Sequence, residues 1–517
     1  MTTTTQQYEL GKDLKRNMEF FDRELGVKES FDIIKRPISV GGRDGVFYMV
    51  DGFVKDDIML HIMRGLMNIQ REEILDDNLE ILFKKYIPYV EVEKQKDVST
   101  IITFVLAGAV CFMLDGYGFA FVIDARTYPA RGPEEPDIER VSRGARDGFV
   151  ETVVFNTALI RRRLRDPRLR MELMQVGKRS RTDIVVCYIN DITNPRLVGK
   201  IKKRLSTINI DGLPMAEKSL EELLDPKGNW NPFPKVRYTE RPDVAAVHLL
   251  EGHVVIIVDG SPSVIIAPTT YFHHLQHAEE YRQNPLVGAY LRWIRFLGIF
   301  ASTFLLPLYY LVSVEPGLLP DYLQFIGPEK FGKVPLLVQF LLAEIGVDLI
   351  RMAAIHTPSP LATAMGLIAA VLIGEIAINI GLFVPEVILY AALAAVGTFS
   401  TPSYEVSLAN RFIRYFLLLA SAVFKLPGYV GGIILLFVFL ALSRSFGIPY
   451  LWPLIPFNAA ALFHIILRSP VPIQKYRPAV LEPLDKKRQG RRFIPLPLRR
   501  IGQYKMKRRY DSDEDKK

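Results

Sequence analysis

The residues most able to take part in chemistry are charged side chains inside long apolar stretches. Glu344, Asp348 and Arg351 stand four and three positions apart, so a helix starting near residue 336 presents them on one face. Glu375 and Asn379 repeat the four-residue spacing on the next apolar stretch. Ionisable residues at membrane depth are costly and mark a protein-lined or water-filled interior. These five residues predict a polar face that either lines a pore or pairs between helices.

Small residues recur every four positions between these two charged segments. The positions are Ala362, Gly366, Ala370 and Gly374. Such a stripe lets two helix backbones approach closely, so it predicts helix packing within one subunit or between subunits.

Two other patterns resemble ligand sites but lack essential members. Residues 327–334, GPEKFGKV, match a phosphate-binding loop until Val334, where Ser or Thr must ligate magnesium. His273, His274 and His277 offer imidazoles at helical spacing, without an acidic or cysteine partner at suitable spacing. We expect no cofactor and no metal. The chain also shows no catalytic nucleophile and base constellation, which indicates a non-enzymatic protein.

Apolar runs after residue 296, most of them uncharged, predict an all-α, multi-pass transmembrane bundle. The candidate crossings are 296–314, 336–350, 352–374, 387–404, 411–425 and 426–443. Residues 445–467 are long enough to cross but hold Pro449, Pro453 and Pro456, so we expect a re-entrant or interfacial segment.

The distribution of positive charge predicts the orientation of this bundle. The chain has 65 Lys and Arg against 56 Asp and Glu, a net charge of +9. Residues 468–517 hold 16 Lys and Arg and 6 Asp and Glu, a net of +10, so the rest carries 49 minus 50, about −1. This excludes a basic nucleic-acid-binding domain, and the tail beside a membrane suits anionic lipid headgroups. With Arg292, Arg295, Arg411 and Arg414 near the predicted crossings, the positive-inside rule places both termini in the cytosol.

The first half of the chain reads as a soluble α/β domain that is duplicated. Asp115-Gly116 and Asp259-Gly260 each join two apolar, alternating strands, which is a strong hairpin signal. The offsets between corresponding aspartates agree, because 191 minus 51 is 140, 259 minus 115 is 144 and 243 minus 97 is 146. We therefore expect two copies of one module with the same strand order.

The remaining features of this half fit a cytosolic domain. The N-terminal residues lack the apolar core of a signal peptide, and Cys111 and Cys187 lie in apolar strand-like runs, as buried, reduced thiols do. The predicted segments are an N-terminal segment (1–30), α/β module 1 (31–128), a linker and connecting helix (129–178), α/β module 2 (179–283), the transmembrane helical domain (284–467) and the basic tail (468–517).

Three long runs of this sequence resemble the A subunits of bacterial spore germinant receptors, the GerA family. They are EEPDIERVSRGARDGFVETVVFNTALIRRRLRDPRLRMELMQVGKRSRTDIVVCYIND (134–191), NPFPKVRYTERPDVAAVHLLEGHVVIIVDGSPSVIIAP (231–268) and SRSFGIPYLWPLIPF (443–457). Ala145 and Asp147 replace the Pro and Glu usual in the family, and residues 351–358, RMAAIHTP, lack the Glu and second Arg of a family motif. These departures favour a sporulation paralogue over a nutrient receptor.

The resemblance implies a multi-pass protein of the spore inner membrane. Such a subunit would form an oligomer with itself and with other germination membrane proteins, and would be channel-like, contributing to ion release during germination. The alternatives are a nutrient-sensing germinant receptor A subunit or a secondary transporter, whose inverted repeats we do not find in the helical half.

Overall fold

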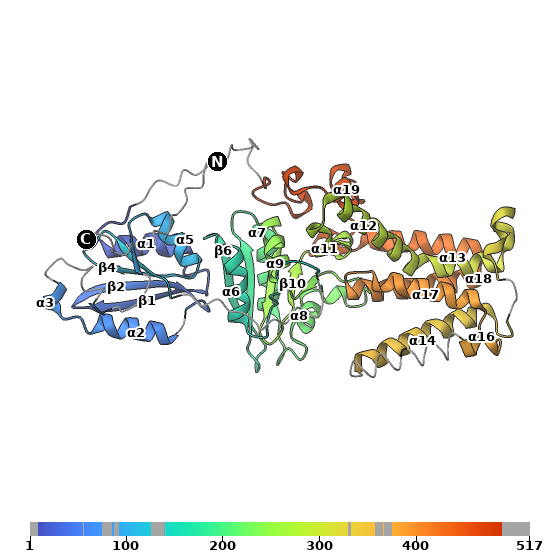
Figure 1. Ribbon diagram of the computed structural model, residues 1–517, viewed down its shortest axis with the longest axis horizontal. Coiled ribbons are helices and arrows are strands. Elements are labelled where there is room, and N and C mark those ends of the chain that lie inside the picture. The colour runs from blue at the N-terminus through green and yellow to red at the C-terminus, as the bar shows by residue number, and fades with distance from the viewer. Residues whose placement is uncertain are drawn as a thin grey trace, which may run out of the picture.

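The computed structural model describes residues 9–54, 56–74, 85–86, 92–125, 139, 141–328, 332–356, 366 and 375–488. Three parts follow one another along the longest axis: one α/β module, a second α/β module and a helical domain (Figure 1). The second module lies in the middle, so it is the module that lies next to the helical domain.

Module 1 is a five-stranded antiparallel sheet with helices on both faces. Its strand order is β1-β2-β4-β5-β3. The elements are α1 (Leu14–Leu25), β1 (Ile33–Val40), β2 (Arg43–Val50), α2 (Asp56–Met67), α3 (Arg71–Ile74), β3 (Val92–Gln95), α5 (Val98–Leu106), β4 (Val110–Leu114) and β5 (Ala120–Ile123). Helices α1 and α5 belong to one core cluster and α2 to the other, and β4 is buried along its whole length between them.

Module 2 repeats this plan element by element. Its strand order is β6-β7-β9-β10-β8, so the predicted match of strand orders is confirmed. The elements are α6 (Val153–Arg163), β6 (Leu169–Val176), β7 (Thr182–Ile189), α7 (Pro195–Thr207), α8 (Ala216–Leu224), β8 (Arg237–Thr239), α9 (Pro242–Glu251), β9 (Val254–Val258) and β10 (Val264–Ala267). The two Asp-Gly turns hold Gly116 at φ +89° and Gly260 at φ +87°, which glycine adopts without strain.

The structure corrects the boundary predicted between the modules. Helix α6 and strand β6 fall in the segment expected to be a linker, yet β6 is an edge strand of the second sheet. Phe149, Val153 and Leu159 belong to the core of module 2. Helix α6 therefore corresponds to α1, and both helices precede the first strand of their modules. Sequence reasoning missed β1 and β6 because each is a half-exposed edge strand with a mixed polar pattern.

The helical domain contains two helices long and apolar enough to cross a membrane, among the described residues. One is the continuous run Pro285–Val314 and the other is α18 (Tyr404–Leu442). Six crossings thus remain a prediction, and most of the predicted crossing 352–374 lies outside the described residues. The elements are α10 (Tyr271–His274), α11 (Ala278–Arg282), α12 (Pro285–Phe300), the π-helical η2 (Ala301–Leu305), α13 (Leu306–Val314), α14 (Leu336–His356), α16 (Ala377–Asn379), α17 (Pro385–Phe399) and α19 (Ala459–Ile466).

Helix α18 is a helical hairpin that reverses direction at Lys425. This residue has φ 53° and ψ −135°, which is not helical. A Cβ at Gly432 would lie 2.7 Å from Cδ2 of Leu417, although a straight helix would separate them by about 22 Å at 1.5 Å per residue. The arms 404–424 and 426–442 therefore pack against each other. Their boundary agrees with the separate segments 411–425 and 426–443 predicted from the sequence.

The proline-rich stretch after α18 docks on module 2, a placement that sequence analysis did not foresee. Phe446 belongs to a core cluster of that module, and its carbonyl accepts a hydrogen bond from Nζ of Lys200 at 2.8 Å. The backbone N–H of Tyr271 donates to the carbonyl of Tyr450 at 2.9 Å. Part of segment 445–467 therefore packs on the α/β domain. Its prolines are compatible with this placement, because they prevent a continuous helix.

The first part of the basic tail also lies on module 2. The backbone N–H of Leu484 donates to the carbonyl of Ile192 at 2.9 Å, and Arg488 forms an ion pair with Glu251 at 2.9 Å. Residues 468–488 thus have a structural partner within the chain, where headgroup contact had been expected. Residues 489–517 lie outside the described part of the chain.

Candidate functional site

Two arginines of α18 pair with two carboxylates of α14 inside the helical domain. Arg414 pairs with Glu344, and the two side chains are 1% and 2% exposed. Arg411 pairs with Asp348, whose Oδ2 also accepts a hydrogen bond from the Tyr415 hydroxyl at 3.0 Å. We call these four charged residues the α14–α18 charge cluster. The carboxylates keep the four-residue spacing predicted from the sequence, and their partners come from a helix some 65 residues further along the chain.

Arg351, the third charged residue of the predicted face, makes a different contact. Its guanidinium lies over the ring of Tyr404, 4.7 Å from the centroid, as a cation–π contact. Glu375 and Asn379 are exposed in the single chain and lie apart in the sequence from the cluster. Of the small-residue stripe, only Gly366 is described, so that prediction lies mostly outside the described residues.

A close contact of two other glycines lets α12 and α17 meet beside the cluster. A Cβ at Gly397 would clash with the carbonyl oxygen of Gly298, so neither position tolerates a larger side chain without movement. Arg414 donates to the carbonyl of Ser302 and to Oγ1 of Thr398 at 3.5 Å, so the guanidinium reaches α17 and η2, which continues α12. The sequence signal was present as isolated glycines in apolar runs, but it does not identify which glycines face each other.

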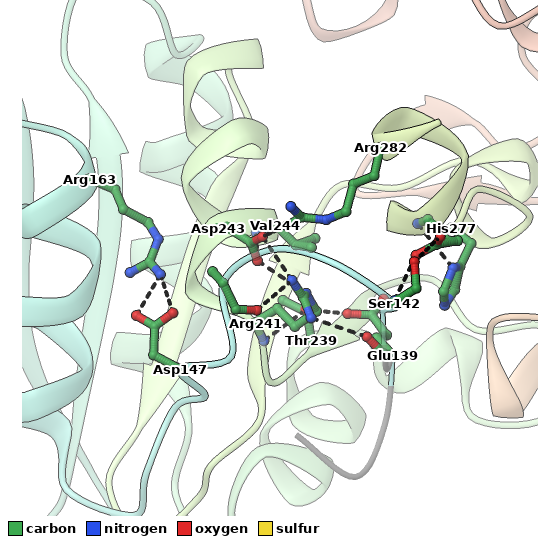
Figure 2. A network of polar contacts seen from close by, with 12 residues as sticks. Glu139, Ser142, Asp147, Arg163, Thr239, Arg241, Asp243, Val244, His277 and Arg282 are labelled. Atoms are coloured by element: carbon green, nitrogen blue, oxygen red, sulfur yellow. Dashed lines mark hydrogen bonds and ion pairs between the residues drawn. The ribbon is translucent and has the colours of Figure 1, made fainter. Parts of the chain in front are cut away.

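A second polar network joins module 2 to the helical domain, and we call it the junction network (Figure 2). Arg241 and Asp243 form an ion pair at 2.9 Å at the start of α9, and Arg282 of α11 reaches the same Asp243 carboxylate at 2.8 Å. Glu139 accepts from Arg237 at 2.6 Å and from the Thr239 hydroxyl at 2.6 Å. These residues fall within or close to the motifs that carry the family resemblance.

The segment around residues 142–147 forms polar contacts with both α11 and module 2. Ser142 donates through its backbone N–H and its hydroxyl to Glu279 of α11, at 2.9 and 2.5 Å. Arg163 of α6 donates to both oxygens of Asp147 (Figure 2). Ala145, the other departure from the family pattern, contributes its carbonyl as an acceptor for Arg241 at 3.2 Å.

Helix α11 also links the junction network to α12. Glu280 is fully buried and pairs with Arg292 at 2.6 Å and with Arg295. Arg292 also donates to the carbonyls of His464 and Ile465 of α19, at 3.1 and 2.7 Å. Arg292 and Arg295 therefore share one buried carboxylate. The positive-inside rule counts Lys and Arg whether or not a carboxylate pairs with them, so the predicted orientation stays a prediction.

The three histidines singled out from the sequence have separate roles. His273 closes a capping box on α10, where its Nδ1 accepts from the Thr270 backbone N–H at 3.2 Å. His274 is buried and contacts Oγ1 of Thr269 at 3.2 Å, and His277 caps α11 by accepting from the Glu279 N–H at 3.2 Å. Burial lowers the pKa of His273 to about 4. Residues 329–331 of the phosphate-loop pattern lie outside the described residues.

The fold and these two networks define a class of protein: a pair of α/β modules attached by a polar junction to an apolar helical domain with internal charge pairs. The sequence matches the family described as Bacillus/Clostridium GerA spore germination protein over residues 21–480. The chain belongs to the GerA family, as the sequence resemblance indicated.

Individual relatives cover nearly the whole chain. It is 51% identical over 474 residues to stage V sporulation protein AF of Bacillus subtilis (strain 168), covering 92% of this chain and 96% of that protein. It is 32% identical over 486 residues to spore germination protein GerLA of Bacillus cereus, covering 92% and 97%. The crystal structure of the N-terminal domain of the A subunit of the Bacillus megaterium spore germinant receptor GerK3 aligns with a TM-score of 0.41 at 26% identity, covering 51% of this chain and 98% of that chain.

Proposed function

We propose that this chain is a non-enzymatic, multi-pass membrane subunit of a spore germination apparatus, and that its helical domain contributes to ion release. One observation carries the membrane assignment: polarity in the helical domain is reversed. Large apolar side chains point outward, with Val423 70% and Leu442 77% exposed, whereas Arg414 and Glu344 are almost fully buried. Such a surface is unfavourable in water. In a membrane it is stable, because the outer apolar side chains contact hydrocarbon and the buried charges pair with each other.

The exposed polar residues supply the argument for a channel-like oligomer. Glu375 and Asn379 are exposed on a domain whose outer surface is otherwise rich in large apolar side chains. In a bilayer these two polar side chains need water or another subunit, which an oligomer around an aqueous path provides. The α14–α18 charge cluster then holds the helices together. Of the face predicted from the sequence, Glu344 and Asp348 take part in helix packing, and Glu375 and Asn379 line the aqueous path.

The junction network gives the α/β modules a role in this proposal. Asp243 and Arg282 connect module 2 to α11, and Glu280 connects α11 to α12. A movement of module 2 would therefore act directly on the first apolar helix. Homologous germination proteins are the proposed partners, and the spore inner membrane with both termini on the cytosolic side is the proposed location.

The test measures ion release from spores of the source organism, followed as conductivity of the medium after germination is triggered. Spores lacking this chain should release ions more slowly, and spores carrying Glu375→Gln at normal protein abundance should resemble them. Asp211→Asn, at an exposed loop of module 2, is the matched control and should behave as wild type. Normal release in the spores lacking this chain would contradict the proposal.

A further inference from the structure

Three residues able to bind metal lie within one six-residue stretch, HLLEGH, at the end of α9. His248 and Glu251 are three positions apart on the helix, so they share a face. Gly252 follows with φ +104°, a left-handed conformation that ends the helix and turns the chain so that His253 returns toward that face. One ligand atom from each of the three residues lies within 4.8 Å of the others.

Hydrogen bonds fix both imidazoles in the tautomer that metal ligands use. Nδ1 of His248 is 2.8 Å from the Val244 carbonyl, and Nδ1 of His253 is 2.8 Å from the Pro268 carbonyl. A carbonyl only accepts, so each Nδ1 carries the hydrogen and each Nε2 presents a lone pair. Metal-bound histidines show this same contact between the other ring nitrogen and a backbone carbonyl. Burial lowers the pKa of His248 to about 3, so its ring is neutral at pH 7.

One of these lone pairs has no hydrogen-bond partner among the described residues. Nε2 of His253 is buried and forms no hydrogen bond to the described residues, and the side chain is 0% exposed. It lies 4.0 Å from Oε2 of Glu251, too far for a hydrogen bond. Oε1 of Glu251 accepts from Arg488 at 2.9 Å, which orients the carboxylate as outer-shell partners of metal ligands do. A buried acceptor left unpaired is unfavourable, and a bound cation would remove that cost.

A cavity lies beside Glu251 and is also lined by the C-terminal segment. Its volume is about 280 Å³, and its lining includes Glu251, His273, Gln276 and Arg488. The ring of His273 lies 5.1 Å from that of His253, centroid to centroid. Because Nδ1 of His273 accepts from the Thr270 N–H, its Nε2 carries the hydrogen and can donate to a further ligand in the cavity.

From this geometry we propose that His248, Glu251 and His253 form a binding site for a divalent transition metal ion, with Zn²⁺ as the best chemical match. Two imidazole nitrogens and one carboxylate oxygen are a ligand set that Zn²⁺ accepts, and water or a further ligand in the cavity beside Glu251 would fill the fourth position. The ion would join the end of α9 to β9 and, through Glu251 and Arg488, to the C-terminal segment that covers module 2.

The test uses the full-length chain in detergent, stripped with a chelator, incubated with Zn²⁺ and desalted, with bound metal measured by mass spectrometry. The wild type should retain one Zn²⁺ per chain. Glu251→Gln and His253→Gln should lose at least tenfold in affinity, and Co²⁺ in place of Zn²⁺ should give d–d absorption bands in the wild type alone. His61→Gln removes an exposed imidazole of α2 and should retain one ion.

Two results would overturn the proposal: a wild type that retains no stoichiometric metal, or both variants binding as the wild type does. Circular dichroism of each variant checks the fold. Should His253→Gln fold poorly, Glu251→Gln decides, because its amide oxygen still accepts from Arg488 while the ligand charge is gone.

Discussion

Asp32 and Arg161 form a buried, bidentate ion pair across the boundary between the two α/β modules. Nε and Nη2 of Arg161 donate to the two carboxylate oxygens at 2.9 and 3.0 Å, and both side chains are 1% exposed. Beside them, the Phe31 N–H donates to the Met171 carbonyl at 3.1 Å. The pair therefore fixes how one copy of the repeat meets the other.

Asp32→Ala should destabilise the α/β domain by about 3–5 kcal/mol, because it leaves the guanidinium of Arg161 buried without a counter-charge. Asp211→Asn removes an exposed pair with Arg179 and should change stability by about 1 kcal/mol or less. Urea unfolding of the full chain measures both. The double variant Asp32→Ala with Arg161→Leu should recover part of the loss, and simple additivity of the two single changes would contradict the coupling.

Glu344→Gln should lower the yield and thermal stability of the detergent-solubilised chain, because Arg414 then stays buried without a carboxylate. Arg414→Gln in the same chain should restore part of both, since the uncompensated charge is gone. Arg351→Gln should not restore them, because Arg351 lies over Tyr404. Size-exclusion profiles and melting curves give the comparison, and rescue by Arg351→Gln would show that the pairing differs from the one described.

Asp243→Asn should loosen the connection between module 2 and α11, because it removes the acceptor charge shared by Arg241 and Arg282. Hydrogen exchange of residues 278–295 should then become faster, while the sheet of module 2 keeps its protection. Asp211→Asn is the control, since it removes an exposed ion pair with Arg179 that lies within module 2. Equal effects of the two changes on residues 278–295 would argue against a path through Asp243.

Buried histidines should make the metal-free chain less stable as the pH falls below neutrality. Burial lowers the pKa of His248 to about 3 and of His273 to about 4, from 6.5 in an unfolded chain. Between pH 6.5 and about 4 the unfolded chain binds protons that the folded chain does not, so stability falls by up to about 1.4 kcal/mol per pH unit for each histidine. Glu251, whose pKa burial raises, acts in the opposite direction near its own pKa.

Replacing one of these histidines should flatten that dependence. His273→Gln keeps a side chain able to complete the capping box of α10, while it removes one titrating group. Melting temperatures measured with a chelator between pH 7 and pH 5 should decline less steeply than in the wild type. His61→Gln, at an exposed position, is the control. An unchanged slope for His273→Gln would show that this ring does not titrate as its burial implies.

Two truncations should separate the roles of the basic tail. Deleting residues 489–517 removes 10 of the tail's 16 Lys and Arg and should weaken binding to anionic vesicles while the melting temperature stays unchanged. Deleting residues 468–517 should also lower the melting temperature, because contacts of Arg468, Leu484 and Arg488 are lost. Equal melting temperatures for the two truncations would contradict the docking of residues 468–488.

The sequence by itself determined those features that depend on local pattern. The Asp-Gly turns and apolar alternation located the hairpins β4–β5 and β9–β10 in both modules, and constant offsets between aspartates revealed the repeat. Uncharged length located the apolar helices, and the break between residues 425 and 426 coincides with the turn of the α18 hairpin. In each case the information lies within a few residues, which is where backbone preference and side-chain period act.

Only the tertiary structure decided which charged groups meet. The spacing of Glu344, Asp348 and Arg351 predicted a polar face but not its partners, and Glu344 pairs with Arg414 of α18 because the packing of two distant helices brings them together. Likewise His273 was grouped with His277 by spacing, while the fold brings it beside His253 of another element. The motif HLLEGH is present in the sequence, but only the turn at Gly252 and the burial of His253 show that its side chains converge as a possible ligand set. Pairing of buried polar groups is set by packing between distant segments, and a one-dimensional pattern holds no record of that packing.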